Sequence, residues 1–394
     1  MLFTSDMLHA LLHLPSPINH NSHSHDIQIT LNGEVNNLEI KQAIFSFKPY
    51  KALGPNSFHL VFFQRYWNIV GLFVISLIKT IFQSKKVPEN LNSMLICLIP
   101  KTERPETVHQ FRPIGLCNTL YKIVTKLLVQ RLKAFLLNLK HPFQASFVLG
   151  RKASDNVILT QEIIHTISTS KSKSELMALK IDLEKAFNRM EWSFIYHIIC
   201  CFKFSKDWVD LIMSCITSSN LSVLVNGERT DFFSPSRGIL QGDPLSPYLF
   251  ILCMEYLATL IEIENSHRNW TGVKTSREGL IFSHLFFAND LLLFAKATKK
   301  NCLTIKKVLC EFYSFSGQKV NPSKSKIFFS PHTKTKHISL IENDLGMHHT
   351  NSFRKYLGVP IIMDKRDKRA FDYVIDKIRT KLSTWKARSL SLAS

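Results

Sequence analysis

The most constraining feature of this 394-residue sequence is an aspartate-bearing turn between two short apolar segments. Residues 281–287 and 291–294 are almost entirely apolar, and only Ala288, Asn289 and Asp290 separate them. Apolar runs of this length, joined by so few residues, are typical of two strands connected by a tight turn. We therefore expect a strand–turn–strand unit with Asp290 at its tip.

A second aspartate ends another expected strand. Residues 176–183 form an apolar run that contains Asp182 near its end. If Asp182 and Asp290 meet over one sheet, they offer the hard oxygen ligands that Mg²⁺ prefers. Two such ions can activate a 3′-hydroxyl and stabilise the leaving pyrophosphate. By itself the pair favours a strand-end Asp and a turn Asp that bind no metal.

The remaining pattern mixes helices with antiparallel hairpins, which predicts an α+β fold. Strand-like segments lie at 94–100 and 221–233, the second with the hairpin signal Asn226-Gly227. Apolar positions recur at helical spacing in residues 38–47, 62–82, 120–139, 156–167, 192–202, 208–217, 245–263, 301–315 and 371–385.

The charge balance points to a polyanionic partner. Lys and Arg number 50 and Asp and Glu number 30, which gives a net charge of +20. Nucleic acid is the first candidate, an anionic membrane surface is the second, and lysines that only maintain solubility are the third. The apolar run 69–82 is short for a spanning helix and contains Lys79, so we expect no membrane partner.

Metal-binding and secretion signals are weak in this sequence. Its eight cysteines include no C-x-x-C pair, and the N-terminus has no basic leader, so we expect reduced thiols and no secretion. His20, His23 and His25 are close enough in sequence to hold a metal, but a polar N-terminal tail explains them better.

Six segments occur in a diagnostic order. They are 98–101 (LIPK), 111–118 (FRPIGLCN), 180–187 (KIDLEKAF), 238–247 (GILQGDPLSP), 287–290 (FAND) and 356–360 (YLGVP). Together they resemble the reverse transcriptase of plant non-LTR (LINE-type) retrotransposons, over roughly residues 36 to 394. No segment before residue 36 resembles the endonuclease of such elements, and no zinc knuckle or ribonuclease H segment follows.

The resemblance implies a right-hand polymerase with an antiparallel palm sheet packed on helices. Its expected divisions are an N-terminal lead-in (1–35), a fingers-rich region (36–175), a palm with an interleaved fingers helix (176–360) and a truncated thumb (361–394). The basic face of residues 365–388 would follow a nucleic-acid backbone, unless it is a plain solvated helix face.

The resemblance also implies the catalytic residues. Asp182, the backbone carbonyl of Leu183 and Asp290 would bind Mg²⁺ or Mn²⁺. Phe187 would lie under the sugar of the incoming nucleotide and exclude a 2′-hydroxyl, although it could equally be a core residue. Gln241 and Gly242 would contact the nucleotide and template, or simply form the entry to the following helix.

Three basic residues would act on phosphate groups. Lys101 and Arg112 resemble residues of the fingers that hold the triphosphate, since the arginine fork suits phosphate geometry. Lys324 resembles a lysine near the leaving phosphate, and each of the three could instead be a solvated surface charge. Residues 356–360 resemble the loop on which the primer rests.

The chain departs from the family at several positions. The family's turn reads Phe-Ala-Asp-Asp, whereas Asn289 stands here in place of the principal metal-binding partner of Asp182. Two further asparagines, Asn56 and Asn188, each replace an aspartate of the family, and Ser57 replaces a glycine. Because an asparagine offers one neutral oxygen in place of two charged ones, we expect metal binding and polymerisation to be severely reduced. The three asparagines also account for three units of the +20 charge.

Three functional hypotheses follow. The chain is a degenerate RNA-directed DNA polymerase domain that uses an RNA template, a DNA primer and deoxynucleoside triphosphates, with no small-molecule cofactor. Alternatively it is a non-catalytic nucleic-acid-binding protein, or a translated remnant without function. We expect it in the nucleus or cytoplasm, and the sequence does not predict its oligomeric state.

Overall fold

The computed structural model describes most of the chain from residue 31 onward. The described residues are 31–50, 52–55, 58–139, 144, 146–147, 150–170, 175–276, 278–353, 355–361 and 372–383. The histidines at 20, 23 and 25, the Asn56–Ser57 pair and most of the expected thumb therefore lie outside the described residues. Mixed helices and antiparallel-rich sheets confirm the predicted α+β class.

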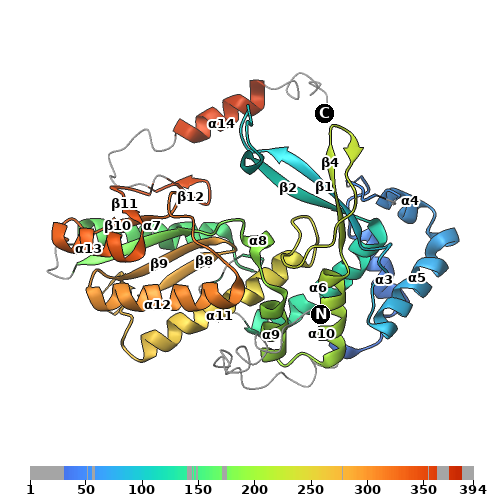
Figure 1. The fold of residues 1–394 in the computed structure, drawn as a ribbon, viewed down its shortest axis with the longest axis horizontal. Coiled ribbons are helices and arrows are strands. Elements are labelled where there is room, and N and C mark those ends of the chain that lie inside the picture. Colours follow the sequence, from blue (N-terminus) through green and yellow to red (C-terminus); the bar gives the residue numbers. More distant parts are fainter. Residues whose placement is uncertain are drawn as a thin grey trace.

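A five-stranded sheet contains both aspartates of interest (Figure 1). Its order is β11 (His348–His349), β10 (Lys326–Phe329), β3 (Leu176–Asp182), β9 (Asp290–Lys296) and β8 (His284–Phe287). β3 is antiparallel to both of its neighbours, β9 and β10, and β8 is antiparallel to β9. The expected strand–turn–strand unit is thus present as β8 and β9, although its first strand is shorter than the apolar run.

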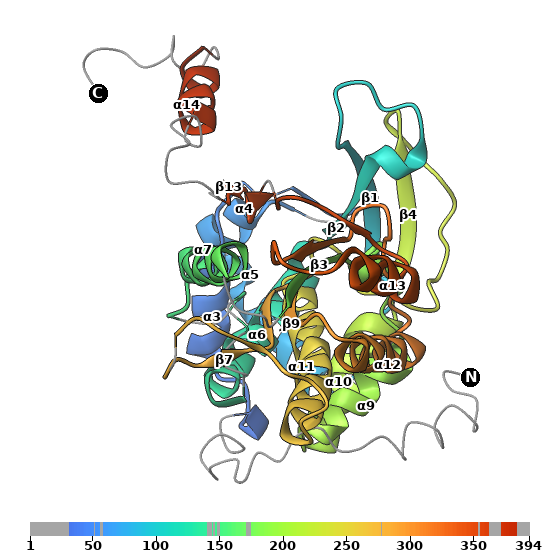
Figure 2. The same cartoon turned by 90° about the vertical axis from the view of Figure 1, so that its left-hand side faces the viewer.

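The two faces of this sheet belong to two separate cores. Met177, Leu179 and Ile181 point into the larger core, while Ala178 joins Leu292 in the smaller one. This alternation follows from the two-residue period of a strand. Figures 1 and 2 show α11 (Ser246–Ser266) and α12 (Lys299–Ser316) on one side of the sheet and α7 (Ala153–Thr169) on the other.

Short helices follow the sheet strands and extend the larger core. They are α8 (Ala186–Arg189), α9 (Trp192–Cys201), α10 (Lys206–Thr217) and α13 (Thr335–Leu345). α11 is buried almost all round and begins with Ser246 and Pro247, where a proline is tolerated because the first helical N–H groups lack partners.

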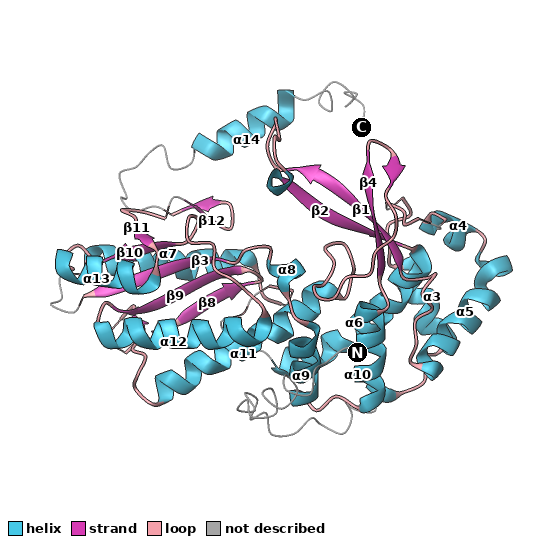
Figure 3. Cartoon of the chain, viewed as in Figure 1, coloured by secondary structure: helices cyan, strands magenta, loops and turns pink. Residues whose placement is uncertain are grey.

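A second, four-stranded sheet lies on the other side of the molecule (Figure 3). Its order is β2 (Phe111–Cys117), β1 (Ser93–Pro100), β4 (Asn220–Val225) and β5 (Glu228–Arg229), and the one-turn helix η1 (Val108–Gln110) precedes β2. The accompanying helices are α3 (Asn37–Phe45), α4 (Leu60–Arg65), α5 (Trp67–Ser84) and α6 (Thr119–Leu139). The predicted hairpin at Asn226-Gly227 is confirmed between β4 and β5.

Two small hairpins and one helix complete the described residues. β6 (Val273–Lys274) pairs with β7 (Ile281–Phe282), and β12 (Lys355–Tyr356) pairs with β13 (Val359–Pro360). α14 (Asp372–Ser383) stands apart from both sheets in Figures 1 and 2. It falls within the helix that the sequence predicts at 371–385.

Two described helices are long and apolar enough to cross a membrane, on length and composition alone. α11 is 78% buried within the protein, which is the position of a core helix. α5 is 18 residues long, longer than the apolar run at 69–82 suggested, and it exposes Ile69, Leu72 and Phe73. A buried core helix and a spanning helix pass the same test, so these lengths assign no membrane role.

Candidate active site

Asp182 and Asp290 are direct partners across two antiparallel strands. Asp182 ends β3, Asp290 begins β9, and the register pairs them. Directly opposed residues of an antiparallel pair project to the same face, so the two carboxylates lie next to each other. Burial raises the pKa of Asp290, the nearby charge of Lys180 opposes that rise, and the charge of Asp182 adds to it.

The main chain of Asp182 is held by a segment that lies far along the sequence. Its N–H donates to the Ser325 hydroxyl (3.1 Å), and its carbonyl accepts from the Asn321 N–H (2.8 Å). Glu184 N–H donates in the same direction, to the Lys319 carbonyl (2.8 Å). Because alternate residues of an extended chain point their polar groups to opposite edges, the Leu183 carbonyl is directed toward the β9 side.

The turn between β8 and β9 consists of Ala288 and Asn289. Ala288 has a φ of 52°, in the left-handed region that costs an ordinary residue about 1 kcal/mol. The hairpin is anchored just before the turn, where Asn156 donates to the Phe286 carbonyl (3.0 Å). Asn289 itself is exposed and immediately precedes Asp290.

Gln241 and Gly242 lie in a loop that joins the two halves of the molecule. The Gln241 carbonyl accepts a hydrogen bond from the Gly115 N–H of β2 (2.6 Å). Gly242 has a φ of 116°, and a Cβ there would overlap the Gly115 carbonyl oxygen. This position therefore needs glycine for both its conformation and its close approach.

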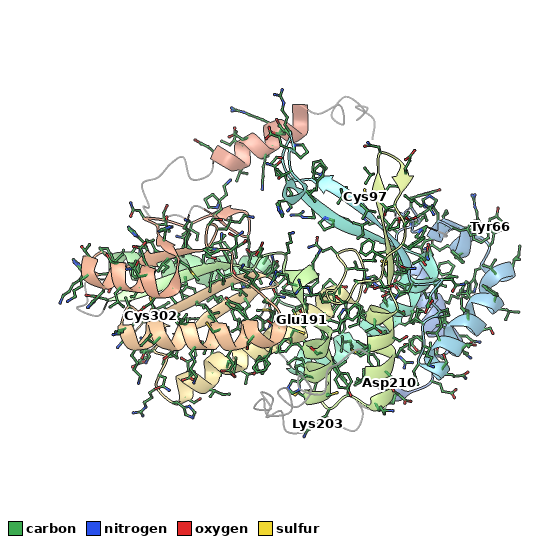
Figure 4. The ribbon with its side chains drawn as sticks, in the orientation of Figure 1. Tyr66, Cys97, Glu191, Lys203, Asp210 and Cys302 are labelled. Carbon is green, nitrogen blue, oxygen red and sulfur yellow. The ribbon has the colours of Figure 1, made fainter. Side chains whose placement is uncertain are left out.

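Phe187 lies beneath this same loop. Its carbonyl accepts from the Ile239 N–H (2.9 Å), and its half-buried ring stacks on Phe250 with centroids 4.8 Å apart. Glu191 lies near the junction of the two halves in Figure 4, where it pairs with Arg237 (3.1 Å). The Phe187 ring is thus partly exposed and also packs on Phe250 of α11, which is compatible both with a position under the nucleotide sugar and with a core position.

The expected phosphate-binding residues are distributed over two regions. Lys101 and Arg112 lie at the β1–β2 hairpin of the four-stranded sheet, the sheet in which Figure 4 labels Cys97. Arg112 is exposed, whereas the Lys101 ammonium donates to the His109 carbonyl (2.9 Å). Lys324 is exposed on the segment that holds Asp182. Among the described residues, no hydrogen bond or ion pair joins these three cations to the two aspartates.

The donor set suits one hard divalent cation. The two opposed carboxylates and the Leu183 carbonyl are oxygen donors of the kind that Mg²⁺ and Mn²⁺ prefer. Within the part of the chain that the structure describes, no cluster of three or more His, Cys, Asp or Glu side chains has a metal-binding arrangement. A third carboxylate would be available if Asn289 were aspartate.

Three polar residues were not singled out from the sequence, and two of them lie beside Asp182. Ser325 and Lys180 adjoin Asp182, and buried Asp243 accepts from Leu245 N–H and the Ser246 hydroxyl (both 3.3 Å). Burial raises the pKa of Asp243 to about 6, against the opposing effect of these hydrogen bonds. The sequence could have predicted that Lys180 lies beside Asp182, because residues two apart on a strand project to the same face.

An aspartate pair on adjacent central strands, below a glycine loop that touches a second sheet, is the arrangement of a template-directed polymerase palm. Residues 99–361 match the family described as reverse transcriptase (RNA-dependent DNA polymerase). The chain belongs to this family, and the expected right-hand polymerase fold is confirmed.

The most similar relatives include proteins of retrotransposable elements, which confirms the resemblance to the non-LTR type. A transposon TX1 protein of Xenopus laevis is 25% identical over 90% of this chain. The Pol polyprotein of the R2DM element of Drosophila melanogaster is 27% identical over 60% of it. This chain covers only 26% and 21% of those two proteins.

Two further similarities cover less or align less well. An uncharacterized mitochondrial protein of Arabidopsis thaliana is 43% identical over 70 residues, which are 18% of this chain and 57% of that protein. An apo telomerase structure from Candida tropicalis aligns with a TM-score of 0.43 at 16% identity, covering 63% of this chain and 52% of the other.

Proposed function

We propose that this chain is an RNA-directed DNA polymerase domain from a plant non-LTR retrotransposon, a degenerate copy whose nucleotidyl transfer is impaired by Asn289. The observation that carries the proposal is the opposition of Asp182 and Asp290, with an exposed asparagine next to them. The 43% identity to a segment of an Arabidopsis protein supports the plant origin.

In this proposal Asp182, Asp290 and the Leu183 carbonyl hold Mg²⁺ or Mn²⁺. Two bound ions would activate the primer 3′-hydroxyl and stabilise the leaving pyrophosphate. Two aspartates bring two negative charges against the four positive charges of two such ions, so the second ion is the one that Asn289 disfavours. The fold is kept because Asn289 is exposed and its side chain supports no packing.

The other residues in this proposal bind and position substrate. Phe187 would lie under the sugar of the incoming nucleotide, Gly242 would contact the nucleotide and template, and Gln241 is fixed by its carbonyl contact with β2. Lys101 and Arg112 approach the triphosphate from the four-stranded sheet. The proposed divisions remain fingers-rich 36–175, palm 176–360 and thumb from 361, acting on an RNA template and a DNA primer in the nucleus or cytoplasm.

Primer extension on an RNA template tests this proposal. We expect the purified chain to extend poorly in Mg²⁺ or Mn²⁺ and Asn289→Asp to be faster by several powers of ten, since a ligand-level loss is worth several kcal/mol, or about tenfold per 1.4 kcal/mol. Asp182→Ala in the Asn289→Asp background is the matched control and should abolish extension. Extension by the unaltered chain at a rate similar to that of Asn289→Asp, and removed by Asp182→Ala, would contradict the proposed impairment.

A non-catalytic nucleic-acid-binding protein is the second candidate, and the net charge of +20 favours it. Binding through phosphate contacts loses affinity steeply with salt because counterions are released. A gel shift with RNA–DNA duplex at increasing salt should therefore show strong binding that weakens steeply. Absence of binding at low salt would remove this candidate.

A further inference from the structure

Lys180 occupies the position directly behind the aspartate pair on the same face of the sheet. It lies two residues before Asp182 on β3, so both side chains project to one side. The register places it between Leu292 of β9 and Lys326 of β10, one row in from Asp182 and Asp290. Any charge on Lys180 therefore acts on the two carboxylates at short range.

The Lys180 ammonium also reaches the β12–β13 hairpin. It donates to the Lys355 carbonyl (2.9 Å), at the first residue of β12. The neighbouring Tyr356 is 1% exposed and packs in the smaller core with Phe353 and Leu292. The attachments of the hairpin to the sheet thus include one buried ring and one hydrogen bond from a charged donor.

These contacts connect two parts with separate proposed roles. The hairpin is the segment proposed to support the primer, and the aspartate pair is the segment proposed to bind metal. Because Lys180 shares a strand face with Asp182 and Asp290, its positive charge attracts their negative charges. A cation that stabilises the carboxylates in this way also opposes a metal ion that binds them.

We propose that Lys180 is a positioning residue that holds the β12–β13 hairpin beside the aspartate pair and supplies part of the positive charge that a metal would otherwise bring. The inference rests on the proposed function, because it assigns a primer and a metal to these two segments. It goes further in giving one side chain two effects of opposite sign, with primer placement favoured and metal affinity lowered.

Lys180→Met tests this inference because methionine keeps the unbranched side chain and removes the charge and the donor. Amide hydrogen exchange in residues 355–360 should become about tenfold faster, because the hairpin loses a hydrogen bond from a charged donor. Mn²⁺ should bind about tenfold more tightly in a paramagnetic resonance titration, because the carboxylates no longer have a competing positive charge beside them. In the Asn289→Asp background, the primer KM should rise more than kcat changes.

Two matched variants serve as controls. Lys180→Arg keeps a charged donor and should preserve both the slow exchange and the Mn²⁺ affinity of the unaltered chain. Lys296→Met removes the same charge from the far end of β9, where Lys296 pairs with Leu176, and should change neither measurement. If Lys180 only stabilised the fold, Lys180→Met would show faster exchange together with weaker Mn²⁺ binding.

The two measurements separate this inference from the proposed function. Unchanged exchange in Lys180→Met would overturn the attachment of the hairpin, whether or not the chain binds metal. Mn²⁺ affinity that stays equal or falls would overturn the charge effect. If Asn289→Asp binds no Mn²⁺ and extends no primer, the proposed function fails and the charge effect fails with it, while hydrogen exchange still decides the attachment.

Discussion

The loop at residues 238–243 and the turn at 288–289 both adjoin the proposed nucleotide site, but they are constrained in opposite ways. The loop is hydrogen-bonded on two sides, through Gly238 to Met190 (2.7 Å) and through Gln241 to Gly115 (2.6 Å). The turn carries an exposed Asn289 and a strained Ala288.

The difference separates what the fold needs from what the chemistry needs. A substitution in the loop disturbs the contact between the two sheets, so it costs stability. In the proposed function, an asparagine in place of an aspartate at position 289 removes one negative charge at an exposed position and costs almost no packing. A chain can therefore lose the reaction while it keeps the architecture that the reaction requires.

Gly242→Ala should have the largest effect on stability. The new Cβ would overlap the Gly115 carbonyl oxygen, and φ at this position is one that alanine avoids, so we expect a loss of about 3 kcal/mol or more. Urea denaturation followed by circular dichroism measures it, with Gly346→Ala, whose Cβ would meet open space, as the control for positive φ alone. Equal effects of the two substitutions would show that the contact with β2 is loose.

Asp243→Asn should flatten the dependence of stability on pH. The pKa of Asp243 is raised to about 6 in the folded chain, so its contribution is full below the unfolded value near 3.8 and is lost as pH rises through 6. Between pH 4 and pH 7 the unaltered chain should lose up to about 3 kcal/mol more than Asp243→Asn. Parallel unfolding free energies for the two proteins would contradict this.

Trp192→Phe should have an intermediate effect. The Trp192 indole donates to the Gly238 carbonyl (2.7 Å), and its removal leaves that carbonyl without this donor, at a cost of about 1–2 kcal/mol. Hydrogen exchange across 238–243 should also accelerate, which thermal unfolding alone would not detect. Unaltered protection in this loop would assign its rigidity to the backbone contacts.

Ala288→Gly should give a small change of the opposite sign. Glycine adopts a φ of 52° without strain, so the free energy of unfolding should rise by about 0.5–1 kcal/mol.

Asn289→Ala should change the free energy of unfolding by no more than about 0.5 kcal/mol, as for other exposed positions. If Asn289→Ala destabilises by more, the turn supports the fold after all, and the contrast with the loop weakens.

Local patterns predicted the parts of this site that lie on regular strands. The apolar runs around Ala288 and Asp290 predicted β8 and β9, and the position of Asp182 at a strand end followed from the same reasoning. These elements have short periods that are visible within a few residues. The long helix α11 was predicted on the same basis, from the apolar spacing at 245–263.

The partners that hold these strands could not be predicted, because they are set by tertiary contacts. Ser325 lies in a polar segment that looks like a loop, yet its hydroxyl binds Asp182 from 143 positions away. β10 is only four residues long, and α13 buries only Ile341, so both gave weak patterns. The hydrogen bond from Lys180 to Lys355 likewise has no local signature.

The strand order has a consequence for how this protein is made. β3 is central in its sheet, but its neighbours β9 and β10 come much later in the chain, at 290–296 and 326–329. At about 5–20 residues per second, a ribosome would leave both edges of this apolar strand unpaired for several seconds or longer. Slow synthesis or scarce chaperones should thus favour aggregation of nascent chains, since an unpaired apolar edge is a template for other strands.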